Sequence, residues 1–404
     1  MKDLILAVLN LINSLIPKGK TVIFNSFPDL EGNTLALFEY ILKEHRELIL
    51  DGRIVWSING RNTREAGARI SKLAGGIKMP VVRKLSVTGI LTYLTASKII
   101  TTHNYITGLH TAKGQKLYQL IHGMPYKAGG NLIRNANDKD GVEADVMIAD
   151  SEYFKEILSK VADIKEDDIY VTGLPADDKV LHPDNALHKL GIDKDRYNRV
   201  LLWSPTYRRS DVGSIRYDGS KDAFGIDKIL SDKAYIGESG PGAKSKALLD
   251  DELRKLGFLL IVKFHPMDAL RNSDLTGSDN MIIVSDEMMK KAEVSFNELM
   301  GDCDVFITDY SSAFHTFMIT KRPVAFVTDD MEEYASNRGF AMEDPASLMA
   351  GERISDMKEL LNYLENMDEI NLKWRDRYKE VLALMHKYTD GRSSERVYNI
   401  IFKK

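Results

Sequence analysis

Cysteine is nearly absent from this sequence, which has one such residue among 404. A single cysteine excludes a disulfide framework and any zinc site built from several thiolates. Cys303 stands in apolar surroundings beside a predicted strand. We therefore interpret it as a buried thiol of the core rather than a nucleophile, in a protein of a reducing compartment.

Membrane-spanning runs and the common nucleotide-binding fingerprints are also absent. Residues 1–16 are mostly apolar but too few to span a bilayer, and they lack the small-residue cleavage site of a signal peptide. The glycine–lysine pattern of a P-loop does not occur, and no GxGxxG follows the first predicted strand, so NAD binding has no support. Metal-ligand spacing is poor, and we expect that the protein requires no metal or other cofactor.

The first sixteen residues do have the pattern of an apolar helix, closed by Pro17-Lys18-Gly19-Lys20. So many neighbouring apolar residues would cover more than one face of a helix. This favours an amphipathic helix, residues 1–20, that lies in the plane of a membrane and is flanked by lysines. The alternative is a helix docked on a neighbouring domain.

Positive charge is concentrated in one part of the chain. From Arg61 to Arg134 there are twelve Lys or Arg residues and a single acid, Glu65, so this segment carries +11 while the whole chain carries −4. Such a field attracts an anionic membrane, a polyphosphate or a nucleic acid. Aromatic residues are sparse here, which argues against a module that stacks bases. The alternative is a set of solvated helix faces balanced by acids elsewhere.

Predicted strands alternate with predicted helices along most of the chain, which indicates an α/β fold with parallel sheets. One series runs from a strand at 21–24 to a strand at 169–172, and a second series begins at 199–203. Residues 210–245 lack periodicity, and we expect a long loop with one short helix there.

These two series predict two doubly wound, Rossmann-like domains. We place them at residues 21–190, on the acceptor and membrane side, and at residues 196–385, on the donor side, with a C-terminal helix at 386–404. Ligands of doubly wound sheets bind at the carboxyl ends of the strands, so we expect the active site in an interdomain cleft.

Polar motifs follow four predicted strands, at the points where these strands end. The motifs are Ile121-His122-Gly123-Met124-Pro125-Tyr126-Lys127, Ser204-Pro205-Thr206-Tyr207-Arg208, Phe264-His265-Pro266 and Thr308-Asp309-Tyr310-Ser311-Ser312. Histidine titrates near neutral pH, so it can take a proton from an attacking hydroxyl or, when protonated, pair with a phosphate. We expect His122 to face an acceptor and His265 to face a leaving phosphate.

The last of these motifs has the pattern of an anion site. Ser311 and Ser312 precede a helical pattern, and free N–H groups with the positive end of a helix dipole favour an anion there. Arg208 would add a bidentate phosphate contact. The simpler interpretation is an N-cap made by Asp309 or Ser311.

Taken together, these motifs resemble the CDP-glycerol:poly(glycerophosphate) glycerophosphotransferase family, the primases and polymerases of teichoic acid and related capsule polymers. Two further segments, Gly173-Leu174-Pro175-Ala176-Asp177-Asp178 and Asp390-Gly391-Arg392-Ser393-Ser394-Glu395-Arg396, fit the same family. The resemblance covers nearly the whole chain, from the first predicted strand to the last helix.

This resemblance implies a GT-B fold and transfer of glycerol phosphate from CDP-glycerol to a hydroxyl of a lipid-linked or polymeric acceptor, with release of CMP. It also implies peripheral attachment to an anionic membrane surface at the cytoplasmic face of the cell membrane. The family's two essential histidines carry over onto His122 and His265. Expected substrate-binding residues are Gly123, Thr206, Arg208, Pro266, Thr308, Asp309, Ser311 and Ser312. Expected acceptor-side or membrane-side residues are Lys84, Lys113, Lys116 and Lys127.

The chain departs from the family pattern at three places. Met124 stands where Thr is usual, Tyr126 stands where Leu is common, and an Arg is missing between Leu174 and Asp178. These changes leave the acceptor and the polyol open, so CDP-ribitol or a nucleotide sugar is an alternative donor. The alternative of another class is a non-catalytic polyanion-binding protein. The sequence does not indicate an oligomeric state.

Overall fold

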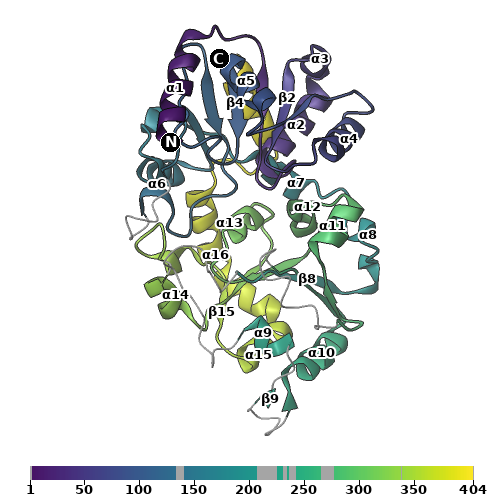
Figure 1. Ribbon diagram of the computed structural model, residues 1–404. Helices are drawn as coiled ribbons and strands as arrows, with labels where there is room; N and C mark the ends of the chain where they lie inside the picture. Colours follow the sequence, from purple (N-terminus) through teal and green to yellow (C-terminus); the bar gives the residue numbers. More distant parts are fainter. Residues whose placement is uncertain are drawn as a thin grey trace. The chain divides into compact units, whose positions relative to one another are not determined.

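The computed structural model describes residues 2–132, 141–206, 225–230, 234–235, 243–264, 277–337 and 339–403 (Figure 1). The chain divides into two compact units, which we describe one at a time. Unit 1 comprises Met1–Met124, Asp140–Asp178 and His386–Lys404, and unit 2 comprises Pro125–Lys139 and Lys179–Met385.

Unit 1 is built on a parallel sheet that has seven strands among the described residues. In spatial order they are β3 (Val81–Arg83), β2 (Ile54–Ile58), β1 (Val22–Phe24), β4 (Lys98–Thr101), β5 (Lys116–Gln119), β6 (Val146–Ala149) and β7 (Ile169–Val171). The chain order reverses between β1 and β4, which are parallel neighbours. Ligands of open α/β sheets bind at such a reversal, outside the carboxyl ends of the strands.

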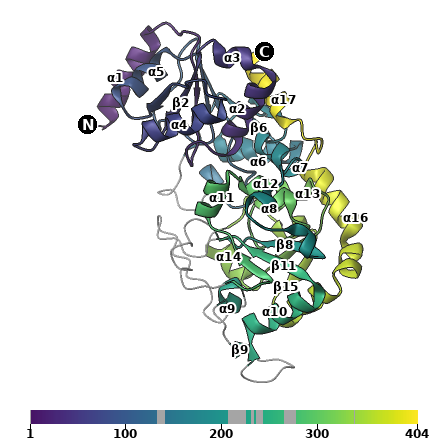
Figure 2. The ribbon, with the colours of Figure 1, turned by 90° about the vertical axis from the view of Figure 1, so that its right-hand side faces the viewer.

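Helices cover the sheet of unit 1. They are α1 (Lys2–Leu15), α2 (Gly32–Glu44), α3 (Arg46–Leu50), α4 (Thr63–Leu73), α5 (Val87–Thr95), α6 (Glu152–Ala162) and α17 (Ser393–Tyr398), with short turns η3 (Glu166–Asp168), η4 (Pro175–Asp177) and η8 (Asn399–Lys403). Although α17 is far from α2 in sequence, the two lie side by side (Figure 2). Tyr398 of α17 stacks on His45 with ring centroids 3.7 Å apart.

Unit 2 is built on a second parallel sheet, with six strands among the described residues. In spatial order they are β12 (Met281–Ile283), β11 (Phe258–Val262), β8 (Arg199–Trp203), β13 (Val305–Thr308), β14 (Val324–Val327) and β15 (Glu352–Ile354). Here the chain order reverses between β8 and β13. Strands β11, β13 and β14 are buried along their whole length, as expected for a parallel sheet covered on both faces.

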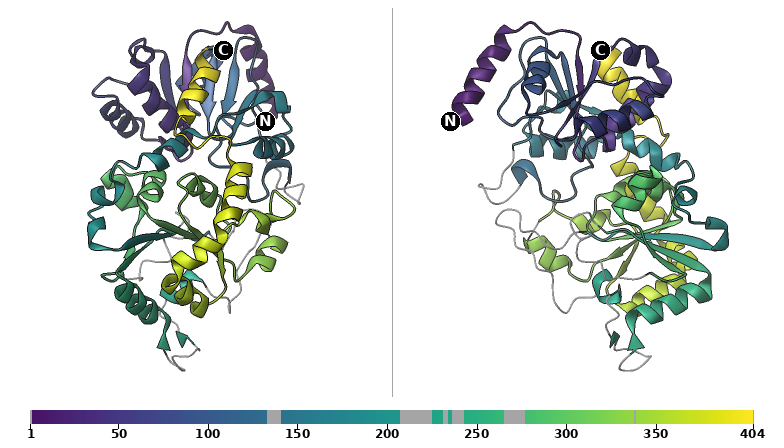
Figure 3. Two further views of the ribbon diagram at one scale, coloured as in Figure 1. Left: turned by 180° about the vertical axis from the view of Figure 1, so that it is seen from behind. Right: turned by 45° about the vertical axis from the view of Figure 1, so that its right-hand side comes forward.

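Helices also surround the sheet of unit 2 (Figure 3). They are α8 (Ala186–Lys189), α9 (Ile226–Leu230), α10 (Ser245–Leu256), α11 (Asp286–Ala292), α12 (Phe296–Asp302), α13 (Ala313–Met318), α14 (Met331–Asn337), α15 (Met357–Glu365) and α16 (Met367–Met385). The remaining elements are α7 (Asp178–Leu181), η1 (Gly130–Leu132), η5 (Lys194–Arg196), η7 (Pro345–Leu348) and the short antiparallel pair β9 (Ala234–Tyr235) and β10 (Ala243–Lys244).

The two parallel sheets confirm the predicted α/β fold class. Cys303 is fully buried at the end of α12, and burial raises the pKa of its thiol, which confirms the interpretation as a core residue. Most of the segment 210–245, expected as a long loop, lies outside the described residues.

Helix α1 docks on unit 1 by one face only. Asn10 donates to the Gly108 carbonyl at 2.9 Å, Asn13 donates to the His110 carbonyl at 2.9 Å, and Leu6 and Leu9 pack against the buried core. The other face carries apolar side chains that are exposed, namely Leu4, Ile5, Val8, Leu11, Ile12 and Leu15. Among the described residues, no helix is long and apolar enough to cross a membrane.

Candidate active site

In unit 1, a buried amide fixes the backbone just before His122. Asn33, on α2, is 2% exposed, and its Nδ2 donates to the carbonyls of Leu120 and Ile121, both at 2.9 Å. Its Oδ1 accepts a hydrogen bond from the Ala176 N–H of η4 at 2.9 Å. Ile121 has a φ of +45°, a left-handed conformation that is rare for a β-branched residue. Asn33 therefore holds a strained turn that leaves the His122 side chain exposed after β5.

A second imidazole stacks on His122. The ring of His103, which follows β4, lies 5.0 Å from the His122 ring at an interplanar angle of 12°. Thr102 Oγ1 and His103 Nδ1 are 2.8 Å apart, which fixes the ring. Burial, together with His122 and Lys84, lowers the pKa of His103 to about 4, so this imidazole is neutral at physiological pH.

Sequence reasoning missed both Asn33 and His103. A signal for His103 was available, because β4 and β5 are neighbours and polar residues at the ends of neighbouring parallel strands meet at one edge of the sheet. Asn33 carried no comparable signal, since its function depends on carbonyls that lie far along the chain.

The candidate lysines of unit 1 fall into two groups. Lys84 lies over the Tyr105 ring, and burial lowers the pKa of its ammonium group while the Asp29 carboxylate opposes this effect. Lys113 and Lys116 are exposed. Lys113 precedes β5 and Lys116 is its first residue, whereas His122 lies beyond the last residue of this strand. Only Lys84 is therefore near the two imidazoles, and Lys113 and Lys116 belong to the opposite edge of the sheet.

In unit 2, the loops after β8 and β13 are joined by buried hydrogen bonds. The Asp309 carboxylate accepts from the Thr206 N–H at 2.8 and 3.0 Å and from the Thr206 hydroxyl. Thr308 Oγ1 donates to the Ser204 carbonyl at 2.7 Å. Thr206, Thr308 and Asp309 are all buried. In this structure these three residues hold the two strand ends together.

Ser311 and Ser312 are the more accessible part of the same motif. Both are half-buried, and Ser312 is the N-cap residue of α13 but makes no side-chain cap hydrogen bond. Ser311 Oγ accepts from the Ala313 N–H at 3.3 Å, whereas the Asp309 carboxylate accepts from Thr206. The N-cap position thus belongs to Ser312, and the hydroxyls of the two serines lie at the start of the helix.

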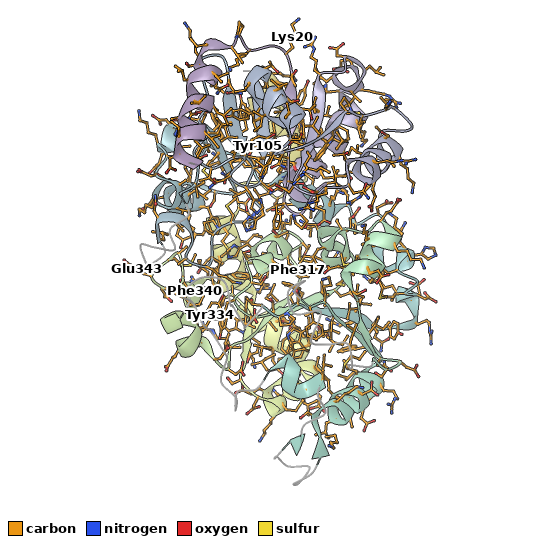
Figure 4. All side chains as sticks on the ribbon, in the orientation of Figure 1. Lys20, Tyr105, Phe317, Tyr334, Phe340 and Glu343 are labelled. Atoms are coloured by element: carbon orange, nitrogen blue, oxygen red, sulfur yellow. The ribbon has the colours of Figure 1, made fainter. Side chains whose placement is uncertain are left out.

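Lys127 lies in unit 2 rather than with the basic segment of unit 1. Its ammonium group is 6.0 Å from the Tyr334 ring centroid, and the Ala128 N–H donates to the Gly339 carbonyl at 3.2 Å. Figure 4 shows Tyr334 near Phe340, and their ring centroids are 5.6 Å apart. Tyr126, which replaces the usual Leu, is buried and donates to the Pro345 carbonyl at 2.8 Å. This departure from the family pattern therefore serves packing.

The structure places Gly123 directly after His122, half-buried. Three other predicted site residues, Arg208, His265 and Pro266, lie outside the described residues. Their contacts with substrate stay predictions.

Known proteins are similar to this chain over most of its length. It is 23% identical over 416 residues to the teichoic acid glycerol-phosphate transferase of Staphylococcus aureus (strain NCTC 8325 / PS 47), covering 96% of this chain and 95% of that protein. It is 24% identical to TarK, the teichoic acid ribitol-phosphate polymerase of the same strain, covering 98% and 71%. The teichoic acid poly(glycerol phosphate) polymerase of Bacillus subtilis (strain 168) is 24% identical, covering 96% of this chain but 49% of that polymerase.

Solved structures share the fold. The wall teichoic acid polymerase TagF superposes with a TM-score of 0.70 at 21% identity, covering 100% of this chain and 95% of that chain. The Staphylococcus aureus protein MnaA, solved with UDP, superposes with a TM-score of 0.53 at 12% identity, covering 94% and 96%. These likenesses confirm the predicted GT-B-like architecture of two Rossmann-like domains.

The strongest comparison is with a whole family. Its model, described as CDP-glycerol:poly(glycerophosphate) glycerophosphotransferase, matches residues 7–403. The match includes every segment on which the resemblance was based, from the His122 turn to the closing Asp390–Arg396 segment. This chain therefore belongs to the CDP-glycerol:poly(glycerophosphate) glycerophosphotransferase family and is a transferase.

Proposed function

We propose that the protein transfers glycerol phosphate from CDP-glycerol to a hydroxyl of a lipid-linked or polymeric acceptor, in the synthesis of a teichoic acid or capsule-type polymer. The family match supports the reaction class. The observation that carries the assignment to a site is the exposed His122, held after β5 by Asn33 and stacked on a neutral imidazole.

In the proposed reaction the acceptor oxygen attacks the β-phosphorus of CDP-glycerol in line with the leaving group. A bond forms between that oxygen and phosphorus, the bond to the bridging oxygen breaks, and CMP leaves with the electron pair. His122 accepts the proton of the hydroxyl as the bond forms. The reaction needs no covalent enzyme intermediate and, in this proposal, no cofactor.

Unit 2 would bind the donor. The Ser311 and Ser312 hydroxyls at the start of α13 are suited to the diphosphate, and Thr206, Thr308 and Asp309 would keep that loop in place. We assign His265 and Arg208 to the leaving phosphate and Pro266 to the same turn, on the family resemblance alone.

A separate question is which polyol, glycerol or ribitol, the donor carries. Relatives named for glycerol phosphate and for ribitol phosphate are equally similar to this chain, at 24% identity for one of each kind. CDP-ribitol is therefore the second candidate donor. Rates of CMP release with CDP-glycerol, CDP-ribitol and a UDP-sugar, each with its acceptor, would rank the three donors.

We also propose that unit 1 binds the cytoplasmic face of the cell membrane peripherally. The outer face of α1 is apolar, and α5, which α1 contacts, exposes Leu91 and is preceded by exposed Leu85. Lys20 follows the docked helix in the sequence, and Lys113 lies two residues before Gln115, which accepts a hydrogen bond from Asn13 of the helix. Both lysines are exposed. Apolar side chains flanked by lysines fit an anionic lipid surface.

The test of the reaction is CMP release from CDP-glycerol by the purified protein, with and without a glycerophosphate or lipid-linked acceptor. We expect acceptor-dependent release, and we expect His122→Ala to lower it by about a hundredfold or more. His188→Ala, which removes an exposed histidine of unit 2, is the matched control and should leave the rate unchanged. Full turnover by His122→Ala would refute the assignment of the base.

A further inference from the structure

Three side chains of the types that bind metals meet inside unit 1. Asp150 follows β6, Asp177 ends η4, and His386 follows α16, so they come from three distant parts of the chain. Their ligand atoms lie within 4.8 Å of one another. The three residues are only 2%, 5% and 5% exposed, respectively.

The Asp150 carboxylate is poorly compensated at this position. Asp150 Oδ1 is buried and has no hydrogen-bond partner among the residues that the structure describes. Burial and the nearby Asp177 carboxylate raise the pKa of Asp150 well above its usual value. A hydrogen bond with the Leu174 backbone lowers this pKa, but by less. Buried carboxylates are costly unless they are paired, hydrogen-bonded or bound to a metal.

The Nδ1 atom of His386 does not satisfy the Asp150 carboxylate. Its Nδ1 is 4.0 Å from Asp150 Oδ2, which is too long for a hydrogen bond. A divalent cation would add positive charge to the cluster and supply a partner for the orphan Asp150 oxygen.

We propose that Asp150, Asp177 and His386 form a binding site for one divalent transition-metal ion, with Zn²⁺ as the best match. One imidazole nitrogen and two carboxylate oxygens suit Zn²⁺, and water would complete a tetrahedral set. Metal–ligand distances of about 2.0–2.2 Å bring ligand atoms to roughly 3.5 Å apart. The three side chains would therefore move inward by about 1 Å on binding.

The site would fasten the closing segment of the chain to the sheet of unit 1. The Lys387 N–H already donates to the Asp150 carbonyl at 2.9 Å. Asp178, next to Asp177, accepts from the N–H groups of Ser393 and Ser394, both at 2.8 Å, at the start of α17. A metal ion would add a stronger cross-link at the same junction.

The same site would stabilise the turn that carries His122. Asp177 belongs to η4, and the Ala176 N–H of η4 donates to Asn33, whose amide holds the Leu120 and Ile121 carbonyls. The ion itself takes no part in phosphate transfer in this proposal. Its effect is structural, and metal binding can be measured whether or not the donor assignment is correct.

The test uses the full chain, freed of any affinity tag, treated with a chelator and then titrated with Zn²⁺, Mn²⁺ or Mg²⁺. We expect one Zn²⁺ per chain by calorimetry and elemental analysis, and a higher unfolding temperature with Zn²⁺ than with chelator. Asp177→Asn and His386→Gln should each weaken Zn²⁺ binding at least about tenfold. Asp167→Asn, which changes an exposed acid of unit 1, is the matched control.

Two results would overturn the proposal. One is the absence of stoichiometric binding of any of the three ions to the folded wild-type chain, a result that needs no variant. The other is stoichiometric binding that Asp177→Asn and His386→Gln leave unchanged. A metal-independent gain in stability on Asp150→Asn, together with no binding, would identify the cluster as a bare pair of carboxylates.

Discussion

At the residue scale, the imidazole pair of His103 and His122 is the feature with the clearest consequences. One ring is exposed and follows β5, and the other is more enclosed and follows β4. Because the pKa of His103 is lowered to about 4, it stays neutral when its neighbour takes a proton. A neutral ring beside His122 avoids the repulsion that a second imidazolium would cause.

His103 should make the stability of unit 1 depend on pH. Its pKa is about 4 in the folded protein against 6.5 for an ordinary imidazole, so acid favours the unfolded chain. The stability that depends on this group is complete above pH 6.5 and is lost as the pH falls towards 4. Urea midpoints at neutral and mildly acidic pH should therefore differ less in His103→Asn than in the wild type.

The control for this experiment is His188→Asn, at an exposed position of unit 2. It should leave the pH dependence of the wild type intact. An acid-induced loss of stability that is equally steep in His103→Asn would contradict the assignment of this titration to His103.

Asp309 provides a prediction about stability. Asp309→Ala removes the acceptor of the Thr206 N–H and hydroxyl and leaves both buried. We expect unit 2 to lose about 3 kcal/mol, the cost of leaving buried donors unsatisfied. Urea unfolding can be followed by the fluorescence of Trp203, which ends the adjoining strand β8.

Asp344→Ala is the control for that variant. Asp344 caps η7 by accepting from the Ser347 N–H at 3.1 Å and is exposed, so we expect a loss of about 1 kcal/mol or less. Equal losses in the two variants would show that the buried hydrogen bonds between the β8 and β13 loops contribute no more to stability than an exposed helix cap.

At the element scale, α1 is docked on unit 1, as one of the two interpretations of the sequence predicted, while membrane contact stays a prediction. Its asparagines and one apolar stripe dock on unit 1, while a second stripe stays exposed. The periodicity of residues 1–16 shows apolar residues on more than one face, but it does not show which face the protein covers. That distinction depends on the loop around Gly108, which lies far away in the sequence.

The exposed stripe of α1 predicts vesicle binding. Replacing Leu4, Leu11 and Leu15 by Glu should lower partition onto anionic vesicles at least about tenfold, because each buried leucine contributes roughly 1.5–3 kcal/mol. Cosedimentation measures the effect, and Leu372→Glu, at an exposed position of α16, is the matched control. Unchanged partition of the triple variant in a folded protein would exclude this face as the membrane contact.

Other elements show where sequence reasoning reaches its limit. Fully buried strands such as β11, β13 and β14 were predicted within a residue or two, because their apolar runs are continuous. The short strands β3, β12 and β15 were missed, since three residues carry too little periodicity to be recognised. All three lie at or near sheet edges.

At the scale of the whole molecule, the sequence predicted the fold class and the order of the motifs, because both follow from strands alternating with helices. It did not predict how the chain is shared between the units. Residues 125–139 belong to unit 2 although they lie between β5 and β6 of unit 1, and the closing residues 386–404 belong to unit 1. Such exchanges depend on contacts between distant segments, as at the Asp178 cap of α17.

The sequence left two interpretations of the basic charge along residues 61–134, one attracting field or a set of solvated helix faces. The structure distributes these side chains over different places: Lys84 beside the two imidazoles, Lys113 and Lys116 at the opposite edge of the sheet, and Lys127 in unit 2. Charge in a segment of sequence therefore does not define a surface. In a parallel sheet, residues that precede a strand and residues that follow it lie at opposite edges of the sheet.

The divided chain of unit 1 also sets an order of events during protein synthesis. Unit 2 has all of its residues once Met385 leaves the ribosome, whereas unit 1 still lacks His386 and the helix that packs beside α2. Domains fold as units when their residues are available. Residues 386–404 would therefore complete unit 1 after every residue of unit 2 has been made.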